Sequence, residues 1–365
     1  MKICYLADAS SAHTKKWCEF FSKKGYDIHV ISLNDGYIEG VKVHCLNVDY
    51  KRIKKQSSLN KITYIFKIFK IKNILREIQP DIVHAHYASS YGLIGSLVNY
   101  HPYVLSIWGS DIYEFPLKGK VFEAIIKYNL KKADKILSTS KAMAEETKKY
   151  TNKKIYITPF GVDRRIFKPI REIKDNNEKR SNILIGTVKS LEPQYGIKYL
   201  IKAFALLKKE YDNVKLEIAG DGSEKKELQA LCDELQLSND VKFLGRINQQ
   251  EVVNAFNRFD IAVFPSNSES FGVAAVEAQA CGTPVVVSNV GGLPEATFPG
   301  SSSIVVNPKS PNEIYKSLKK LIENKELRIK MGKNGVKFIE DNFDIEDNFN
   351  YINKIYDEIK KEFNI

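Results

Sequence analysis

Short apolar runs alternate with helical patterns along this chain, and that alternation restricts the possible folds more than any other feature. Residues 3–7, 82–86 and 103–107 are typical of buried strands, and helical segments lie between them. Strands that alternate with helices predict parallel sheets covered on both faces. The pattern breaks once, at 164–182, where the polar run REIKDNNEKR predicts a linker, and it restarts at 183–188.

The remaining expected elements extend this pattern through both halves. Further strands are expected at 28–33, 41–46, 135–138, 214–219, 261–264 and 284–288, and helices at 12–24, 51–76, 122–132, 141–150, 196–210, 310–340 and 346–363. At about 100–200 residues per domain, 365 residues indicate two domains. We therefore predict an α/β protein with two Rossmann-like, doubly wound domains. The expected ranges are 1–165, a linker at 166–181, 182–345, and a C-terminal helix at 346–365 that packs back towards the first domain.

Ligands of doubly wound sheets bind outside the carboxyl ends of the strands. With two such domains, the expected site is the cleft between them. Composition excludes several other classes: hydrophobic residues make up 43% and charged residues 27%, as in globular proteins, and no run of about 20 apolar residues could span a membrane. Five scattered cysteines without a Cys-x-x-Cys pair favour the cytoplasm and argue against a disulfide framework.

The net charge of +12 comes from the N-terminal half, because residues 1–170 hold 29 Lys and Arg but only 15 Asp and Glu. The segment 51–76 has nine basic residues and no acidic one, with Ile and Phe at helical spacing. Two interpretations stay open: a helix on the inner face of an anionic membrane, or a solvated lysine face opposite a core stripe. No helix-turn-helix, RNP-type or zinc-finger pattern is present, so no nucleic-acid partner is expected.

The most informative segment is PSNSESFGVAAVEAQACGTP at 265–284. A buried strand ends at Pro265, a polar loop follows, and a helix begins after Gly272. A glycine there lets the backbone approach a ligand closely. The first amides of the helix lack internal partners and the helix dipole favours negative charge, so this end of the helix is suited to phosphate.

Two carboxylates flank this phosphate site, Glu269 before the helix and Glu277 inside it. They would repel phosphate unless they face neutral groups, and sugar hydroxyls are neutral donors that carboxylates accept well. A ligand with phosphate in the middle and hydroxyl-rich groups on either side meets both conditions, as a nucleotide sugar does. The structural alternative is that Glu269 caps the helix and Glu277 is a solvated helix residue.

Two neighbouring segments favour the ligand interpretation: GGLPE at 291–295 follows the next strand, and PFGVD at 159–163 lies near the domain boundary. Together with Glu269-x7-Glu277, these segments resemble the retaining glycosyltransferases of family 4, which have the GT-B architecture. The resemblance runs over nearly the whole chain.

The resemblance implies a role for each matching residue. Glu277 would hold the ribose hydroxyls of the donor and Glu269 the hydroxyls of the transferred sugar, while Gly161 would lie on the donor side. It also implies backbone contacts to the sugar and diphosphate from Ser270, Phe271, Gly272 and Val273.

Family members place a basic pair on the diphosphate, from the loop that reads GTVKSLEPQYG here. Lys189 supplies one cation, but Gln194 and Tyr195 stand where the second is usual. Either Lys189 acts alone or another base compensates, such as Lys198 or Arg246. The structural alternative for Lys189 is an ordinary surface lysine.

The N-terminal domain departs further from the family pattern. Its first loop has Ser11 where glycine is common, and Trp108 replaces a histidine that often precedes Gly-Ser-Asp, so Trp108 is expected either to stack on the acceptor or to belong to the core. Asp111, in the same loop, is expected to make a polar contact. It is assigned as a catalytic residue, as are Glu269 and Lys189.

Three histidines complete the predicted acceptor side. His13 opens the first helix and either contacts the acceptor or lies on the helix surface. His84 and His86 end a strand and are expected on opposite faces, so that one of them, assigned as His86, faces the ligand.

No Asp-x-Asp sequence occurs in the chain, which removes the usual way of holding a metal against a diphosphate. The expected function is that of a metal-independent, retaining hexosyltransferase without a cofactor. It would use a UDP-sugar rather than a GDP-sugar and act on a saccharide or lipid-linked saccharide in polysaccharide assembly. Two alternatives stay open: a nucleotide-sugar 2-epimerase-like isomerase, and a non-catalytic nucleotide-binding protein of the same fold.

Overall fold

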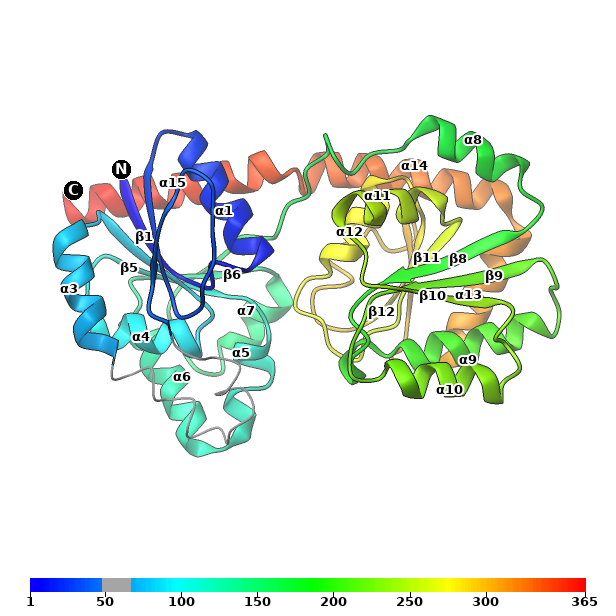
Figure 1. Cartoon of the computed structure of the whole chain (residues 1–365), viewed down its shortest axis with the longest axis horizontal. Coiled ribbons are helices and arrows are strands. Elements are labelled where there is room, and N and C mark those ends of the chain that lie inside the picture. Colours follow the sequence, from blue (N-terminus) through cyan, green and yellow to red (C-terminus); the bar gives the residue numbers. More distant parts are fainter. Residues whose placement is uncertain (48–66) are drawn as a thin grey trace. The chain divides into compact units, whose positions relative to one another are not determined.

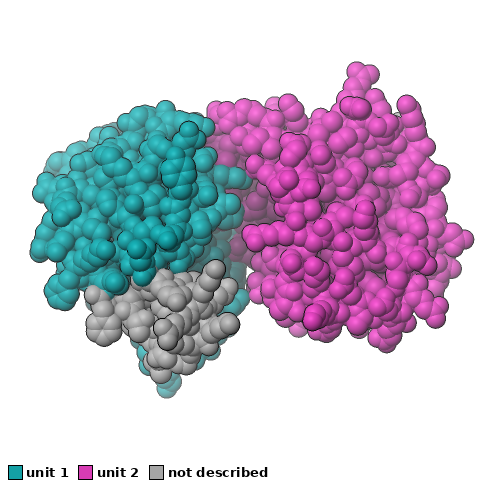
Figure 2. Space-filling model, in the orientation of Figure 1, with its two compact units in different colours: residues 1–158, 349–365 teal, residues 159–348 magenta. Residues whose placement is uncertain are grey.

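A computed structural model describes residues 1–47 and 67–365, and the chain divides into two compact units (Figures 1 and 2). Unit 1 comprises residues 1–158 and 349–365, and unit 2 comprises residues 159–348. The chain therefore passes between the units twice. Most of the basic segment 51–76 lies outside the described residues, as does the greater part of the helix expected there.

Unit 1 is built on a sheet of seven parallel strands in the order β3-β2-β1-β4-β5-β6-β7. The central strands are buried on both faces because helices cover each side of the sheet, which explains their continuous apolar sequences. The strands are β1 (Lys2–Leu6), β2 (Asp27–Ser32), β3 (Lys42–Cys45), β4 (Ile82–His86), β5 (Tyr103–Ile107), β6 (Lys135–Ser138) and β7 (Ile155–Ile157).

Helices lie on both sides of this sheet, with α1 and α15 on one and α3, α4 and α6 on the other (Figure 1). Their buried residues recur at helical spacing, as in α1, where Thr14, Trp17, Cys18 and Phe21 face the core. The helices are α1 (Ala12–Lys23), α3 (Ile68–Ile78), α4 (Ser90–Val98), α5 (Ser110–Tyr113), α6 (Lys120–Lys132), α7 (Lys141–Thr147) and α15 (Ile345–Phe363).

Helix α15 begins in unit 2 and continues into unit 1. From Phe349 onward its apolar side packs into unit 1, where the Phe349 ring stacks on Phe20 with 4.7 Å between centroids. Tyr356 is fully buried, and its hydroxyl lies 2.6 Å from Nδ1 of His84. The last helix thus supplies part of the core of the first domain.

Unit 2 has a second parallel sheet, in the order β10-β9-β8-β11-β12-β13. Helices α9, α10 and α13 lie on one face and α11, α12 and α14 on the other (Figure 1). The strands are β8 (Ile183–Val188), β9 (Val214–Ala219), β10 (Val241–Gly245), β11 (Ile261–Phe264), β12 (Val285–Ser288) and β13 (Ser303–Val306). The helices are α8 (Arg171–Lys179), α9 (Ile197–Lys208), α10 (Lys225–Glu234), α11 (Gln249–Arg258), α12 (Val273–Ala280), α13 (Pro311–Glu323) and α14 (Lys325–Asn342).

The structure confirms the predicted fold class of two doubly wound α/β sheets. It differs at the expected linker 166–181, which contains helix α8 and belongs to unit 2. Tertiary contacts override the polar sequence there, because Asn257 accepts from the backbone of Ile170 at 2.7 Å and Asn177 donates to the Asn257 carbonyl at 2.8 Å. Among the described helices, none is long and apolar enough to cross a bilayer.

Candidate active site

The strand order of unit 2 reverses between β8 and β11. From β8 the chain proceeds outward through β9 and β10 on one side, and through β11, β12 and β13 on the other. The crevice at such a switch point, at the carboxyl ends of the strands, is the ligand site of doubly wound folds. Lys189 directly follows β8, and Glu269 lies in the loop that follows β11, so both predicted residues lie at this crevice.

Lys189 and Glu269 form an ion pair, with 2.5 Å between Nζ and Oε2. Their side chains are only 14% and 10% exposed, so water screens the pair weakly. The Lys189 ammonium also lies 4.3 Å from the centroid of the Tyr195 ring. Tyr195 thus contacts the one cation of this loop through its aromatic face.

The loops that carry this pair are joined by hydrogen bonds. The carbonyl of Gln194 accepts from the backbone N–H of Asn267 at 2.7 Å, and the side-chain amide of Asn267 donates to the Pro193 carbonyl at 2.9 Å. A Cβ at Gly196 would lie 2.3 Å from the Pro265 carbonyl oxygen, so only glycine permits this approach. The pair is therefore set on rigid loops.

Gly272 sets the position of the α12 N-terminus. Its φ is +106°, a conformation that favours glycine, and a Cβ there would lie 2.6 Å from Cδ2 of Leu293. The Glu269 carbonyl accepts from Gly292 at 3.3 Å, which ties the same loop to the turn after β12. The first amides of α12 therefore directly follow the loop that carries Glu269. The phosphate-site prediction requires this order.

The other predicted donor residues occupy different positions. Phe271 is 1% exposed and packs edge-on against Phe343, so its side chain belongs to the core. Glu277 is half-buried on α12, and Ser270 and Val273 border the start of that helix. Only the backbone of Phe271 remains suitable for a ligand contact.

Arg246 and Gly161 lie outside the loops that carry the Lys189–Glu269 pair. Arg246 follows the edge strand β10, two strands away from β8, or about 10 Å at the usual strand spacing. A Cβ at Gly161 would lie 2.4 Å from Cα of Ile345, so backbone packing accounts for this glycine. The role of Arg246 as a second base stays a prediction.

Unit 1 has its own switch point, between β1 and β4. Ser11 precedes α1 in the loop after β1, His13 lies in the first turn of α1, and the His13 ring meets Trp108 edge-on with 5.8 Å between centroids. Burial beside Lys16 lowers the pKa of His13 to about 4, so its imidazole is neutral at pH 7. Three predicted acceptor residues thus gather at one edge of this sheet.

Asp111 has a positioning role that the sequence did not indicate. Its carboxylate is 1% exposed and accepts from the backbone N–H groups of Ala88 and Gly109, both at 2.7 Å. It therefore ties the loop after β4 to the loop after β5. Burial raises the pKa of Asp111, and the backbone donors oppose that rise. The structure therefore gives Asp111 a positioning role in place of the catalytic polar contact that was expected of it.

The expectation that His84 and His86 lie on opposite faces is wrong. Residues two apart in a strand share a face, and the two rings are 5.0 Å apart. Both are at most 1% exposed. His84 bonds to Tyr356 and Ser106, whereas the His86 ring packs between Trp17 and Trp108, with centroid distances of 5.0 Å and 4.4 Å.

Several contacts of the site were not predicted. The Lys189–Tyr195 contact lies within one loop, whereas the bond between Gln194 and Asn267 joins segments about 70 residues apart. Trp17 was not singled out. The only sequence signal at Tyr195 is that it stands where the family usually has a basic residue. In the part of the chain that is described, no three His, Cys, Asp or Glu side chains are grouped as for a metal ion.

Solved structures that match nearly the whole chain have two Rossmann-like domains and the GT-B fold. Sucrose-phosphate synthase from Thermosynechococcus elongatus has a TM-score of 0.86 at 17% identity, over 99% of this chain and 100% of that one. The Anabaena protein HepE in complex with UDP has a TM-score of 0.81 at 20% identity, over 98% and 100%. These likenesses define the fold class as GT-B.

Sequence comparison adds matches to two glycosyltransferase models. Residues 169–338 match the family described as Glycosyl transferases group 1, and residues 2–140 match Glycosyl transferase 4-like. An uncharacterized glycosyltransferase of Methanocaldococcus jannaschii is 29% identical over 342 residues, which is 92% of this chain and 91% of that protein. The chain is a glycosyltransferase of the GT-B type.

Proposed function

We propose that the protein is a retaining, metal-independent glycosyltransferase of family 4 that moves a hexose from a UDP-sugar to a saccharide acceptor. The proposal rests on the Lys189–Glu269 pair at the β8/β11 switch point. Glu269 lies on the loop that leads into α12. HepE, which has the same fold, was solved with UDP, and this supports UDP as the nucleotide of the donor.

In this proposal the donor diphosphate lies at the N-terminus of α12, where amide N–H groups and the helix dipole favour an anion. The Lys189 ammonium has three donor hydrogens, so it can keep one on Glu269 and offer another to the diphosphate. Glu269 and Glu277 accept hydrogen bonds from the transferred sugar and the ribose. No cofactor is required.

The step breaks the bond between the anomeric carbon and the diphosphate oxygen and forms one from that carbon to the acceptor oxygen. Retention follows if the acceptor attacks the face that the diphosphate leaves. The products are the glycosylated acceptor, UDP and the acceptor's proton. Negative charge grows on the diphosphate as the bond breaks, and Lys189 with the α12 amides stabilises it; one such donor is worth about 2.7–4 kcal/mol.

The thermal stability of the protein with UDP, GDP or ADP, each in excess EDTA, tests donor binding. A ligand at about 100 times its Kd stabilises by roughly 2.7 kcal/mol, which is visible as a melting shift. We expect a shift with UDP, weakened by Glu277→Gln and unchanged by Glu326→Gln, which alters an exposed residue. The absence of a shift with every nucleotide would contradict the proposal.

Transfer assays with UDP-sugars test the chemistry. Glu269→Ala should reduce transfer more than UDP binding, and NMR of the product should show the anomeric configuration of the donor. Conversion of a UDP-sugar without any acceptor would instead identify an isomerase, and binding without turnover would identify a non-catalytic protein. Wild-type activity in both Glu269→Ala and Glu277→Gln would refute the site.

We further propose that the acceptor is lipid-linked and that α3 contacts the inner face of an anionic membrane. Ile71, Leu75 and Ile78 of α3 are buried, whereas Phe69 is 82% exposed beside the exposed Lys70. Exposed aromatic and basic residues on one helix are suited to an anionic lipid surface. Flotation with anionic liposomes should succeed and weaken in Phe69→Ser. The control is Tyr37→Ser, which alters a residue that is 76% exposed in the acidic stretch NDGYIEG.

A further inference from the structure

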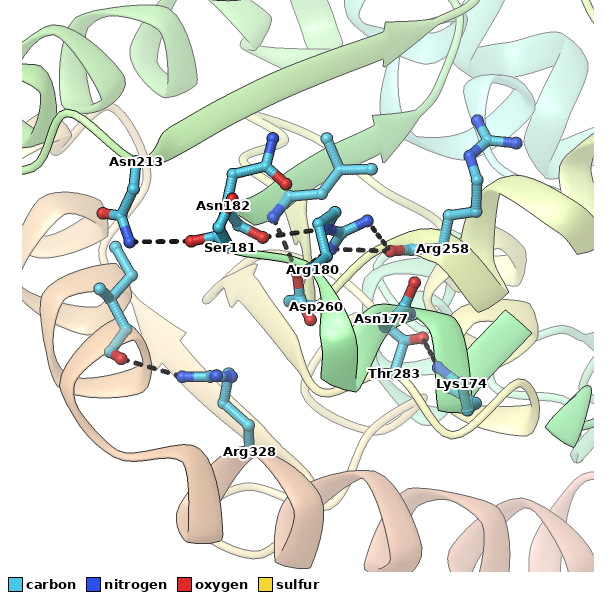
Figure 3. Close-up of polar contacts among 12 residues, drawn as sticks. Lys174, Asn177, Arg180, Ser181, Asn182, Asn213, Arg258, Asp260, Thr283 and Arg328 are labelled. Atoms are coloured by element: carbon cyan, nitrogen blue, oxygen red, sulfur yellow. Dashed lines mark hydrogen bonds and ion pairs between the residues drawn. The ribbon is translucent and has the colours of Figure 1, made fainter. Parts of the chain in front are cut away.

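A cavity of about 180 Å³ lies in unit 2 at the amino ends of β8, β11 and β12. Its lining includes Lys174 from α8, Asp260 directly before β11 and Arg328 from α14 (Figure 3). Lys189 lies at the opposite end of β8, six residues or about 20 Å along the strand. The cavity is therefore separate from the candidate active site.

The lining is strongly basic. It contains four cations, Lys174, Arg180, Lys325 and Arg328, and one carboxylate, Asp260. Asp260 is ion-paired with Arg180 and also accepts from the backbone of Leu184 at 2.8 Å. Because this pair cancels, Lys174 and Arg328 leave the cavity with an excess of positive charge.

Lys174 and Arg328 are held in place by neutral oxygens rather than by carboxylates. Nζ of Lys174 donates to the Thr283 hydroxyl at 3.0 Å (Figure 3). Nη1 of Arg328 donates to the carbonyls of Leu321 and Ile322, at the C-terminal end of α13. Burial lowers the pKa of Lys174 to about 8, which reflects a cation whose charge its surroundings compensate poorly.

A neighbouring hollow of about 610 Å³ shares Arg180 and Asn182 with this cavity but differs in charge. There Arg258 pairs with Glu217, and Lys215 pairs with Asp240, each at 2.7 Å. The cations Arg258 and Lys215 are therefore already paired with carboxylates. The larger hollow is therefore less suited to an anion than the smaller cavity.

We propose that the cavity of Lys174 and Arg328 is an anion site that binds inorganic phosphate or the phosphate group of a small monoester. Arginine and lysine are the usual phosphate ligands, and the N-terminus of α14, which carries Lys325 and Arg328, adds its dipole. Pockets for drug-sized ligands measure about 300–1,000 Å³, so a cavity of 180 Å³ suits a small anion and excludes a nucleotide sugar.

Equilibrium dialysis of the full chain with radiolabelled phosphate, at constant ionic strength in chloride, tests the site. We expect saturable binding that Lys189→Met leaves unchanged and that Lys174→Met or Arg328→Gln weakens tenfold or more. Lys215→Met, in the neighbouring hollow, is the matched control. The proposal is overturned if wild type does not bind saturably, or if Lys189→Met abolishes binding while Lys174→Met retains it.

A local measurement keeps the proposal testable if Arg328→Gln folds poorly. Phosphate should slow acylation of Lys174 severalfold in wild type, as read by peptide mass spectrometry, and leave Lys215 unchanged; equal rates with and without phosphate at Lys174 would refute the site. Competition with glycerol phosphate then shows whether the site prefers inorganic phosphate or a phosphate monoester. Displacement at lower concentration than phosphate itself identifies a monoester site, and displacement only at higher concentration identifies an inorganic phosphate site.

Discussion

The Nζ atom of Lys189 lies 2.5 Å from Oε2 of Glu269, and this ion pair joins the loops that follow β8 and β11. These are the strands between which the order of the second sheet reverses. A cation and a carboxylate are thus paired before any ligand arrives. A ligand with an anionic group beside hydroxyls can use both members without breaking the pair, because each keeps further hydrogen-bonding capacity.

Removing one member of this pair should destabilise the protein strongly. Glu269→Gln leaves the Lys189 ammonium, 14% exposed, without a charged partner, and breaking a buried pair this way costs about 3–5 kcal/mol. The double variant Lys189→Met with Glu269→Gln should recover most of that loss. Urea unfolding measures both effects. Glu145→Gln, in a pair whose side chains are 56% and 69% exposed, should change stability by less than about 1 kcal/mol. Equal losses in the single and double variants would contradict the argument.

Gly272 and Gly300 offer a matched test of backbone approach. Both have positive φ, +106° and +78°, so alanine should cost each about 1–2 kcal/mol. At Gly272 the new Cβ would also lie 2.6 Å from the Leu293 side chain, whereas nothing lies within 4 Å at Gly300. Overpacking should add about 1–3 kcal/mol to Gly272→Ala alone. Urea midpoints that fall equally in the two variants would show that the Leu293 contact does not matter.

Asp111 should matter to stability rather than to nucleotide binding. Asp111→Ala leaves the buried N–H groups of Ala88 and Gly109 without their acceptor, at about 1–3 kcal/mol for each group. UDP binding should be unchanged, because every proposed donor residue belongs to unit 2. Calorimetry with UDP and urea unfolding measure the two quantities. The control is Asp212→Asn at an exposed position. Loss of UDP binding without loss of stability would contradict a positioning role.

Acid should unfold the protein through its buried histidines. Burial lowers the pKa of His84 to about 3 and that of His86 well below its ordinary value. Below about pH 6.5 these histidines therefore bind protons in the unfolded chain but not in the folded chain. Their contribution to the free energy of unfolding is fully present above about pH 6.5 and is lost as the pH decreases. At pH 5 the neutral His84 should cost about 2 kcal/mol, and His86 should add to this loss. Urea midpoints between pH 8 and 4.5 measure this fall. His86→Gln should flatten the slope, and an unchanged slope in this variant would contradict the prediction.

The central strands of both sheets could be predicted because burial on two faces leaves continuous apolar runs. Residues 82–86, 183–188 and 261–264 were predicted with the bounds that β4, β8 and β11 have. The strands β7, β10 and β13 were missed, and all three lie at sheet edges, where partial exposure weakens the apolar signal. The predicted helix 310–340 is two helices, because Asn324 begins α14 by capping the backbone of Leu327.

The candidate site could be predicted in part. Glu269, Gly272 and Lys189 stand out because each follows a buried strand, at the edge where doubly wound sheets bind ligands. The contacts of Asp111 depend on how β4, β5 and the loops after them come together. The shared face of His84 and His86 follows from the two-residue period of a strand and could have been predicted. The basic cavity joins α8, α14 and the starts of three strands, so no local sequence pattern indicates it.

Helix α15 also sets the order in which the protein can complete its structure during synthesis. Residues 159–348 contain all of unit 2, so that domain can close once they have left the ribosome. Translation of unit 1 starts first, yet its core includes Phe349, Ile352 and Tyr356, which are translated after all of unit 2. The domain whose translation starts first is therefore completed second, and His84 gains its Tyr356 partner only after unit 2 has been translated.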